Sequence, residues 1–333
     1  FSSCYTPNYS IYVQNSNLEE VEIEVLRPAK IDIPPQYFNV LFIKNRSIEN
    51  ETRLMEYDRF YKTKKEKYVI NHSIYNYCEE LSYSFQNLPK YKFVNNKEFP
   101  LQVYKNDSIN WDSLQLVCRL NEADAAIIIS GFKSDMTIVT DFNPFNFMFI
   151  PYYRYDFTYA ISAEMMFVDP FEKKILDKIM LNNSHKWIEE RDYKLNISTY
   201  CTNINDHLSI YPAELAKKYS KRISPFWNSE LRKYYGAVNS DFNQTVKYVR
   251  NDEWEKAKEG WQQFSISTKK NLANRANYNL ILAYEMEGEL EKALKQSEKS
   301  YLEYRNYYSL HYGKLIKERI QDQEILKKQL GEE

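Results

Sequence analysis

Hydrophobic and polar positions alternate with two different periods along the first half of the chain. Val21, Ile23 and Val25 alternate with acidic residues, as expected of a half-buried strand. The apolar run 38–43 ends in polar residues, and we expect it to be a buried central strand. A charged loop follows, and then a helix that stops at Pro89. Its apolar face is predicted to carry Ile74, Tyr77, Cys78, Leu81, Phe85 and Leu88.

The same periods continue further along the chain. Residues 91–94 predict the start of a new strand. The stretch "NWDSLQLVCRLNEAD" (110–124) predicts a second amphipathic helix, with Trp111, Leu114, Val117 and Cys118 on one face, and "AAIIISGF" (125–132) predicts a second buried strand. Beyond loops at Pro144 and Pro151, alternate residues from Tyr155 to Phe167 are expected to point inward, and "DPFEKKIL" turns the chain back into a further strand. This order predicts a mixed β-sheet with helices packed on one side.

From about residue 209 the pattern predicts helices only. The stretch "YPAELAKKYSKRISPFW" is amphipathic and ends at Pro225. Further on, the spacing of small and large residues is that of a tetratricopeptide repeat, at Leu280, Ala283, Tyr284, Gly288, Ala293 and Ser300. A degenerate copy precedes it, with Tyr248 matching Tyr284 and Ala257 matching Ala293. Two repeats and a polar terminal helix would form a small solenoid.

These patterns together predict an α+β protein in three parts. Residues 1–20 form a leader or tether, residues 21–208 an α/β domain, and residues 209–333 an all-α, tetratricopeptide-like domain. The chain has 333 residues, 43% of them hydrophobic and 27% charged, which is enough apolar surface for packed cores.

Charge and aromatic content narrow the function classes. The net charge of −1 suggests neither a nucleic acid nor an anionic membrane surface as the partner, and no apolar run is long enough to span a bilayer. The 30 tyrosines suit a binding protein, since each combines large apolar area with a polar tip.

Motif absences exclude several kinds of site. The six glycines are too widely spaced for a P-loop, a dinucleotide-binding turn or a nucleophile elbow. No CxxC pair and no HExxH motif occurs, so we expect no metal and no cofactor. Cys78 and Cys118 fall on apolar helix faces and are predicted to be buried thiols.

The α/β part resembles a domain of Gram-negative envelope lipoproteins. Asn45, Ala123-Asp124, Gly131 and Val168-Asp169 stand where matching residues occur in the curli-secretion lipoprotein, the penicillin-binding-protein activator lipoprotein and the N-terminal domain of the Tol translocation protein. Lys173 or Lys174 replaces the usual turn glycine. The stretches "RISPFW" and "RKYY" resemble the junction in an uncharacterised family of outer-membrane lipoproteins with tetratricopeptide-like C-termini. Together the two resemblances cover about residues 21 to 320, and they imply no catalytic residues.

The first residues, "FSSC", have the form of a lipoprotein signal end: a large apolar residue, two small ones and a cysteine. We therefore expect Cys4 to carry a lipid anchor, which would leave Phe1–Ser3 out of the processed protein. No acidic cluster follows Cys4, which favours the periplasmic face of the outer membrane over the cell surface. "DSI" (107–109) resembles an O-glycosylation site at Ser108.

The predicted function is that of a non-catalytic adaptor or accessory subunit of an outer-membrane or periplasmic protein complex. Its repeats or its α/β domain would bind the partner, and the candidate contacts are Tyr284, Tyr301, Tyr304, Tyr307 and Tyr308. One alternative is a glycan- or peptidoglycan-binding protein. Less favoured is a hydrolase, for which the candidate residues are Glu122, Asp124, Glu189, Glu190, Asp192, Cys201, Asp206 and His207.

Overall fold

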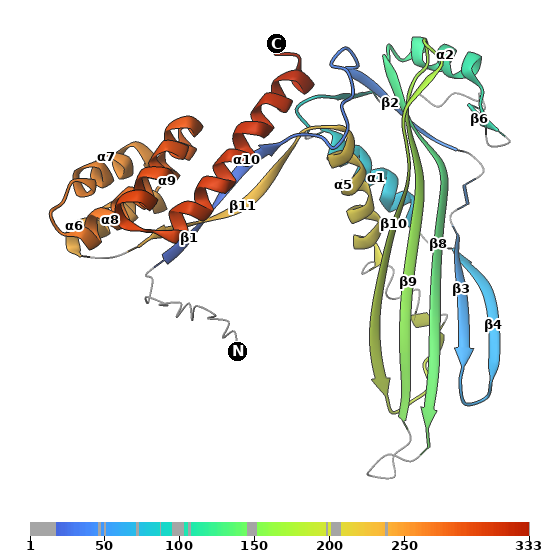
Figure 1. Ribbon diagram of the computed structural model, residues 1–333. Coiled ribbons are helices and arrows are strands. Elements are labelled where there is room, and N and C mark those ends of the chain that lie inside the picture. Colours follow the sequence, from blue (N-terminus) through green and yellow to red (C-terminus); the bar gives the residue numbers. More distant parts are fainter. Residues whose placement is uncertain are drawn as a thin grey trace, which may run out of the picture. The chain divides into compact units, whose positions relative to one another are not determined.

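A computed structural model describes residues 18–45, 48–49, 51–70, 73–86, 88–94, 103–105, 108–144, 152–197, 199–200, 208–236 and 239–332. The chain forms two compact units, shown in Figure 1. An α/β unit comprises residues 28–226 and 328–333. A helical unit comprises residues 1–27 and 227–327.

The α/β unit contains a seven-stranded mixed sheet, a small two-stranded sheet and three long helices among its described residues. In chain order these elements are β2 (Asn39–Lys44), β3 (Glu51–Asp58), β4 (Thr63–Ile70), α1 (Ser73–Gln86), β5 (Lys92–Val94), β6 (Tyr104–Lys105), β7 (Ser108–Ile109), α2 (Trp111–Leu120), β8 (Ala125–Asn143), β9 (Tyr152–Asp169), β10 (Lys174–Arg191) and α5 (Ile210–Ile223).

Strand β8 organises the large sheet, whose order is β10-β9-β8-β2-β5. β8, β9 and β10 are antiparallel neighbours along nearly their full lengths, as Figure 1 shows. The other edge of β8 pairs in parallel first with β2 and further along with β3, which continues into the β3–β4 hairpin. The charged stretch expected to be a loop is thus this hairpin, a correction that the long-range pairing of β3 with β8 explains.

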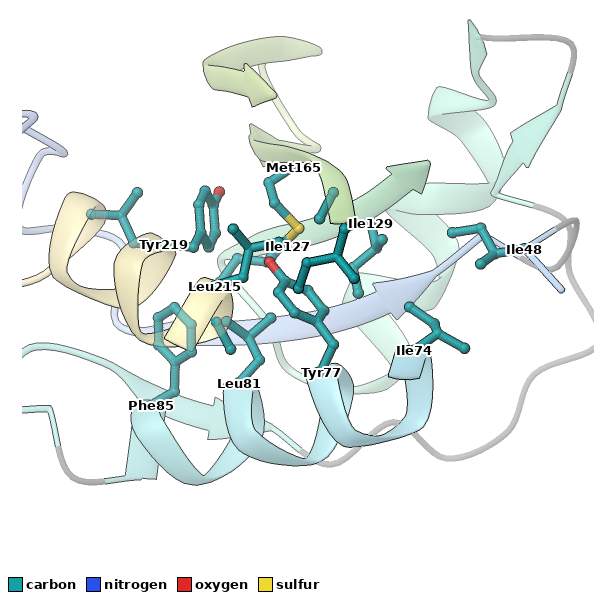
Figure 2. Packing of buried hydrophobic residues seen from close by; sticks show 14 of the residues in the cluster. Ile48, Ile74, Tyr77, Leu81, Phe85, Ile127, Ile129, Met165, Leu215 and Tyr219 are labelled. Atoms are coloured by element: carbon teal, nitrogen blue, oxygen red, sulfur yellow. The ribbon is translucent and has the colours of Figure 1, made fainter. Parts of the chain in front are cut away.

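One face of this sheet packs against α1 and α5. The inward side chains of β9 are those predicted from the alternation, and they are all buried: Tyr155, Phe157, Tyr159, Ile161, Ala163, Met165 and Phe167. Figure 2 shows Tyr77, Leu81 and Phe85 of α1 close to Ile127 and Ile129 of β8, with Leu215 and Tyr219 of α5 beside them.

The opposite face is covered at one end by α2. Its residues Leu114, Val117 and Cys118 pack against Ala126 and Ile128 of β8. The prediction of helices on one side only is therefore wrong. Residues 125–129 are buried on both faces, and a continuous apolar run carries no period that would distinguish one covered face from two.

The helical unit begins with a strand pair and continues as antiparallel helices. Its elements are β1 (Leu18–Arg27), β11 (Phe226–Tyr235), α6 (Ser240–Arg250), α7 (Trp254–Ser265), α8 (Lys270–Met286), α9 (Leu290–Tyr304) and α10 (Tyr307–Leu330), except that Phe226 and residues 328–330 belong to the α/β unit. The core of this unit surrounds Trp261, Ile281 and Ala293. Since β1 pairs with β11, the prediction of helix alone after residue 209 is wrong at 226–235.

The two units also divide the chain differently from the predicted boundaries. Helix α5 forms as predicted, but Leu215 and Tyr219 bury their side chains in the core of the α/β unit. Residues 18–27 pair with β11 rather than opening the α/β sheet. An amphipathic pattern shows which face of an element is buried but not which core buries it.

A buried ion-pair network joins strands and helices of the helical unit. The Glu285 side chain on α8 is fully buried and accepts hydrogen bonds from Arg232 (2.9 and 3.0 Å), Tyr312 (2.6 Å) and Arg319 (2.6 Å). Arg232 also pairs with Glu230 at 2.9 Å. Every charge in this centre has a partner, as a low-dielectric interior requires.

Candidate functional site

Helices α9 and α10 approach each other closely because small residues line their crossing. The hydroxyls of Ser300 and Ser309 lie 2.7 Å apart and are buried. A Cβ atom at Gly313 would lie 2.5 Å from Ser297 Oγ and 3.3 Å from Ser297 Cβ, so a side chain there would displace the Ser297 hydroxyl. The backbone turns between the helices at Arg305, which is left-handed with φ 54°.

A groove of about 310 Å³ lies between α9 and α10. It is lined from α9 by Leu294, Ser297, Glu298, Tyr301 and Leu302, and from α10 by Leu310, Gly313, Lys314 and Lys317. Leu302 is 66% exposed and Leu310 41% exposed. The groove thus brings two exposed leucines, one from each helix, to the same place on the surface.

Two of the five candidate tyrosines belong to this surface. Tyr301 lines the groove, and the ring of Tyr307 stands edge-on to it with the ring centroids 5.8 Å apart. Tyr307 is 64% exposed. We refer to the lining residues together with Tyr307 as the α9–α10 surface.

The other three candidates lie elsewhere. Tyr308 is exposed, but its ring is directed to Tyr278, with centroids 6.4 Å apart. Tyr284 is half-buried against the helical core, and Tyr304 is half-buried outside the groove. Sequence reasoning missed Leu302, Leu310, Lys314 and Lys317. Their signal was helical spacing, since 294, 298 and 302 on α9 and 310, 314 and 317 on α10 each follow one face.

A second hollow, polar in character, lies on the sheet of the α/β unit. It encloses about 760 Å³, with Gly131 at the irregularity of β8 and Tyr68, Arg53 and Glu164 among its lining residues. Arg53 pairs with Asp135 at 2.6 Å. Glu164 accepts from Ser130 at 2.6 Å and pairs with Lys178 at 2.9 Å. These bonds hold the pKa of Glu164 below its ordinary value, against the opposing effect of burial.

Among the residues considered for catalysis, those that the structure describes are not brought together into one site. Asp124 accepts backbone hydrogen bonds from Phe38 and Asn39, which ties β2 to the start of β8. Glu189 stands opposite Tyr155, near the other end of the long strands, and pairs with Arg191 at 2.8 Å.

Glu122 has a left-handed backbone, and Glu190 and Asp192 are exposed. Cys201, Asp206 and His207 lie outside the described residues. Within the described part of the chain, no three His, Cys, Asp or Glu side chains are grouped so as to hold a metal ion.

Some of the remaining predicted positions lie among the described residues, and others do not. Cys4 lies outside the described residues, so its lipidation stays a prediction. Ser108 is exposed in β7, and its glycosylation also stays a prediction. Cys118 is fully buried and Cys78 half-buried, and burial raises the pKa of both thiols to about 12. None of the described helices is long and apolar enough to cross a membrane.

Comparison with sequence families identifies the chain by its α/β part. Residues 39–235 match a domain of unknown function, DUF8603, and residues 243–327 match another, DUF6340. The first match spans more than half of the chain, so the protein belongs to the DUF8603 family. The second family is not described as a tetratricopeptide repeat, so the assignment of these helices to tetratricopeptide repeats stays a prediction.

Curated proteins gave no match. Among solved structures, a neuraminyllactose-binding hemagglutinin homolog from Helicobacter pylori is 14% identical, with 58% of this chain and 86% of that chain covered at a TM-score of 0.28. Lipoprotein GNA1162 from Neisseria meningitidis is 10% identical, with 52% and 99% covered at a TM-score of 0.19. At such scores these likenesses carry no conclusion for this chain.

Proposed function

We propose that this protein is a non-catalytic accessory lipoprotein of the outer membrane, which holds a partner protein through the α9–α10 surface. The observation that carries the proposal is the exposure of Leu302, Leu310 and Tyr307 beside one groove. Leaving these side chains in water forgoes hydrophobic free energy that a docked protein would recover. Aromatic residues are also enriched where protein interfaces concentrate their binding energy.

The anchor belongs to the same proposal and rests on "FSSC" alone. A diacylglyceryl group on Cys4 would hold the protein on the membrane, while the helical unit engages the partner. Mass spectrometry of protein from native membranes should find Cys4 lipidated, with no residues before it. Unmodified Cys4 with residues 1–3 still attached would refute the proposal of a lipid anchor.

Partner binding is tested by co-purification from native membranes. The double substitution Leu302→Asp with Tyr307→Asp places two charges on the α9–α10 surface, and companions of the wild-type protein should be lost. Ile266→Asp is the matched control, because Ile266 is an apolar residue of the same unit, 84% exposed and outside the groove. Companions retained by the double variant, or lost equally by the control, would refute the proposal.

The polar hollow of the α/β unit favours glycan or peptidoglycan binding as a second candidate function. Tyr68 is 62% exposed there, next to hydrogen-bonding groups such as Arg53 and Asn182. Sugars stack on aromatic rings and bond to such groups. Purified peptidoglycan should then retain the wild-type protein and Tyr75→Ala, an equally exposed tyrosine on α1, but not Tyr68→Ala. Equal retention of all three proteins would exclude this hollow as the glycan-binding site.

A further inference from the structure

We propose that the α9–α10 surface receives one amphipathic helix of the partner, with leucine-like residues on its buried face and carboxylates on the flank toward α10. This inference rests on the proposed function, in which the helical unit binds a protein. It adds the secondary structure and the charge of the segment that docks.

The walls of the groove are long enough to contact about two turns of a helix. Its α9 wall is formed at positions 294, 297, 298, 301 and 302, and its α10 wall at 310, 313, 314 and 317. Both series have helical spacing, so the walls are two neighbouring helix faces. Leu294 to Leu302 spans about 12 Å at 1.5 Å per residue, the length of roughly two helical turns.

The helical unit already packs helices in this way. Helix α8 lies between α7 and α9, and its apolar residues share one core with Trp261 of α7 and Ala293 of α9. On the outer side of the α9–α10 pair, the described residues place no helix, and Leu302 and Leu310 stay exposed. An amphipathic helix from a partner would cover them as α9 covers α8.

Charge fixes the orientation of the docked helix. Lys314 and Lys317 stand one turn apart on α10, both are exposed, and neither pairs with a carboxylate within the described part of the chain. Glu298 on the α9 wall is also exposed and has no cationic partner there. A partner helix gains most when its acidic flank faces α10, since like charges opposite the lysines would repel.

The test uses three synthetic helical peptides of about 16 residues with identical leucine stripes. The first carries glutamates on one flank, the second carries lysines there, and the third has the residues of the first in scrambled order. Fluorescence anisotropy measures their binding to the full chain at low salt, where exposed charges are least screened. The glutamate peptide should bind about tenfold more tightly than the lysine peptide, and the scrambled peptide should not bind measurably.

A charge swap gives the decisive control. Lys314→Glu with Lys317→Glu should reverse the preference so that the lysine peptide binds better. Lys247→Glu with Lys270→Glu makes the same change in net charge at exposed lysines of α6 and α8, and should leave the preference unchanged. Circular dichroism verifies that both variants are folded.

Three other outcomes would contradict the proposal that a partner helix docks here. These are equal binding of all peptides, an unchanged preference after the charge swap, or a reversal in the control variant. A wild-type dimer that dissociates on the charge swap would show that a second copy occupies the surface. If the peptides fail but native companions still depend on Leu302 and Tyr307, only the helix inference falls. If companions are independent of these residues, the proposed function falls too.

Discussion

Lys173 adopts a left-handed backbone, with φ 52°, in the turn between β9 and β10. The turn is held by Asp169, whose carboxylate accepts from the backbone amides of Phe171 and Glu172 at 2.8 and 2.9 Å. The resemblance to envelope lipoproteins predicts a glycine in this turn, at the place of Lys173 or Lys174. The structure shows why glycine suits it, since a residue with a Cβ is strained at this φ.

Lys173→Gly should therefore raise the free energy of unfolding by about 0.5–1 kcal/mol, because glycine adopts this conformation without steric cost. The neighbouring Lys174→Gly is the matched control. Lys174 belongs to β10, where glycine weakens a strand, and its substitution should lower stability by about 0.5–1 kcal/mol. Denaturant titration measures both, and a loss of stability in Lys173→Gly would contradict the strain argument.

Lys90 is buried, and its ammonium group donates to the carbonyl of Ile33. Burial lowers the pKa of Lys90 to about 8, although Asp32 acts in the opposite direction. Because the pKa of Lys90 is lower in the folded than in the unfolded state, the charged amine destabilises the folded state. This cost is present below pH 8 and disappears as the pH rises from about 8 toward 10.5.

Lys90→Met should accordingly change stability in a pH-dependent way. Relative to wild type, the variant should gain about 1–2 kcal/mol of stability on going from pH 10 to pH 7, because only the wild type must bury a charge at pH 7 and solvent screens part of that charge. Thermal melting at the two pH values measures the difference. Lys92→Met replaces an exposed lysine of β5 and should show no such dependence. A pH-independent difference for Lys90→Met would refute the assignment.

At the scale of elements, the Glu285 centre links β11, α8 and α10. Burial by itself would raise the pKa of Glu285, but the hydrogen bonds and charge of Arg232, with Tyr312 and Arg319, keep it below the ordinary value of 4.5. A depressed carboxylate pKa contributes stability above about pH 4.5, and that contribution is lost as the pH falls through the folded-state pKa.

Glu285→Gln should cost about 3–5 kcal/mol at pH 7, because it leaves Arg232 buried with less compensating charge. Glu289→Gln breaks an exposed pair with Lys292 and should cost less than about 1 kcal/mol. The difference between the variants should narrow below pH 4.5, because the unfolded wild type then binds a proton that the folded state does not, until the pH reaches the folded-state pKa. Equal stabilities of the two variants at pH 7 would show that the buried centre contributes little.

At the scale of the whole molecule, the helical unit is built from both ends of the chain. Strand β1 supplies Glu19, which accepts from Tyr234 at 2.7 Å and pairs with Arg250 at 3.0 Å. It also supplies Arg27, which pairs with Glu230 at 2.6 Å and Asp322 at 2.7 Å. These contacts lie within one unit and connect residues more than 200 positions apart.

A chain that starts at Pro28 should therefore have a weakened helical unit and an unchanged α/β unit. Hydrogen exchange should become faster in β11 and in α6–α10, while β8–β10 keep their protection. A chain that starts at Leu18 retains β1 and serves as the control. Faster exchange in β8–β10, or unchanged exchange in the helices, would show that the two units do not have separate stabilities.

Local pattern determined much of this protein. The alternation along β9, the helical faces of α1, α2 and α5 and the turn before β10 are all readable from the sequence, because each reflects the period of a single element. The buried position of Cys118 follows in the same way.

Only the tertiary structure decided which elements share a core. The pairing of β1 with β11, the burial of α5 in the α/β unit and the covering of a second sheet face by α2 join segments far apart in the chain. The α9–α10 surface has the same origin. The sequence suggested five tyrosines, of which only Tyr307 and Tyr308 are exposed. The close crossing of α9 and α10 at Gly313 is what places Leu302, Tyr301 and Lys314 along one groove. A period specifies the face that an element buries, and packing between elements decides which residues meet.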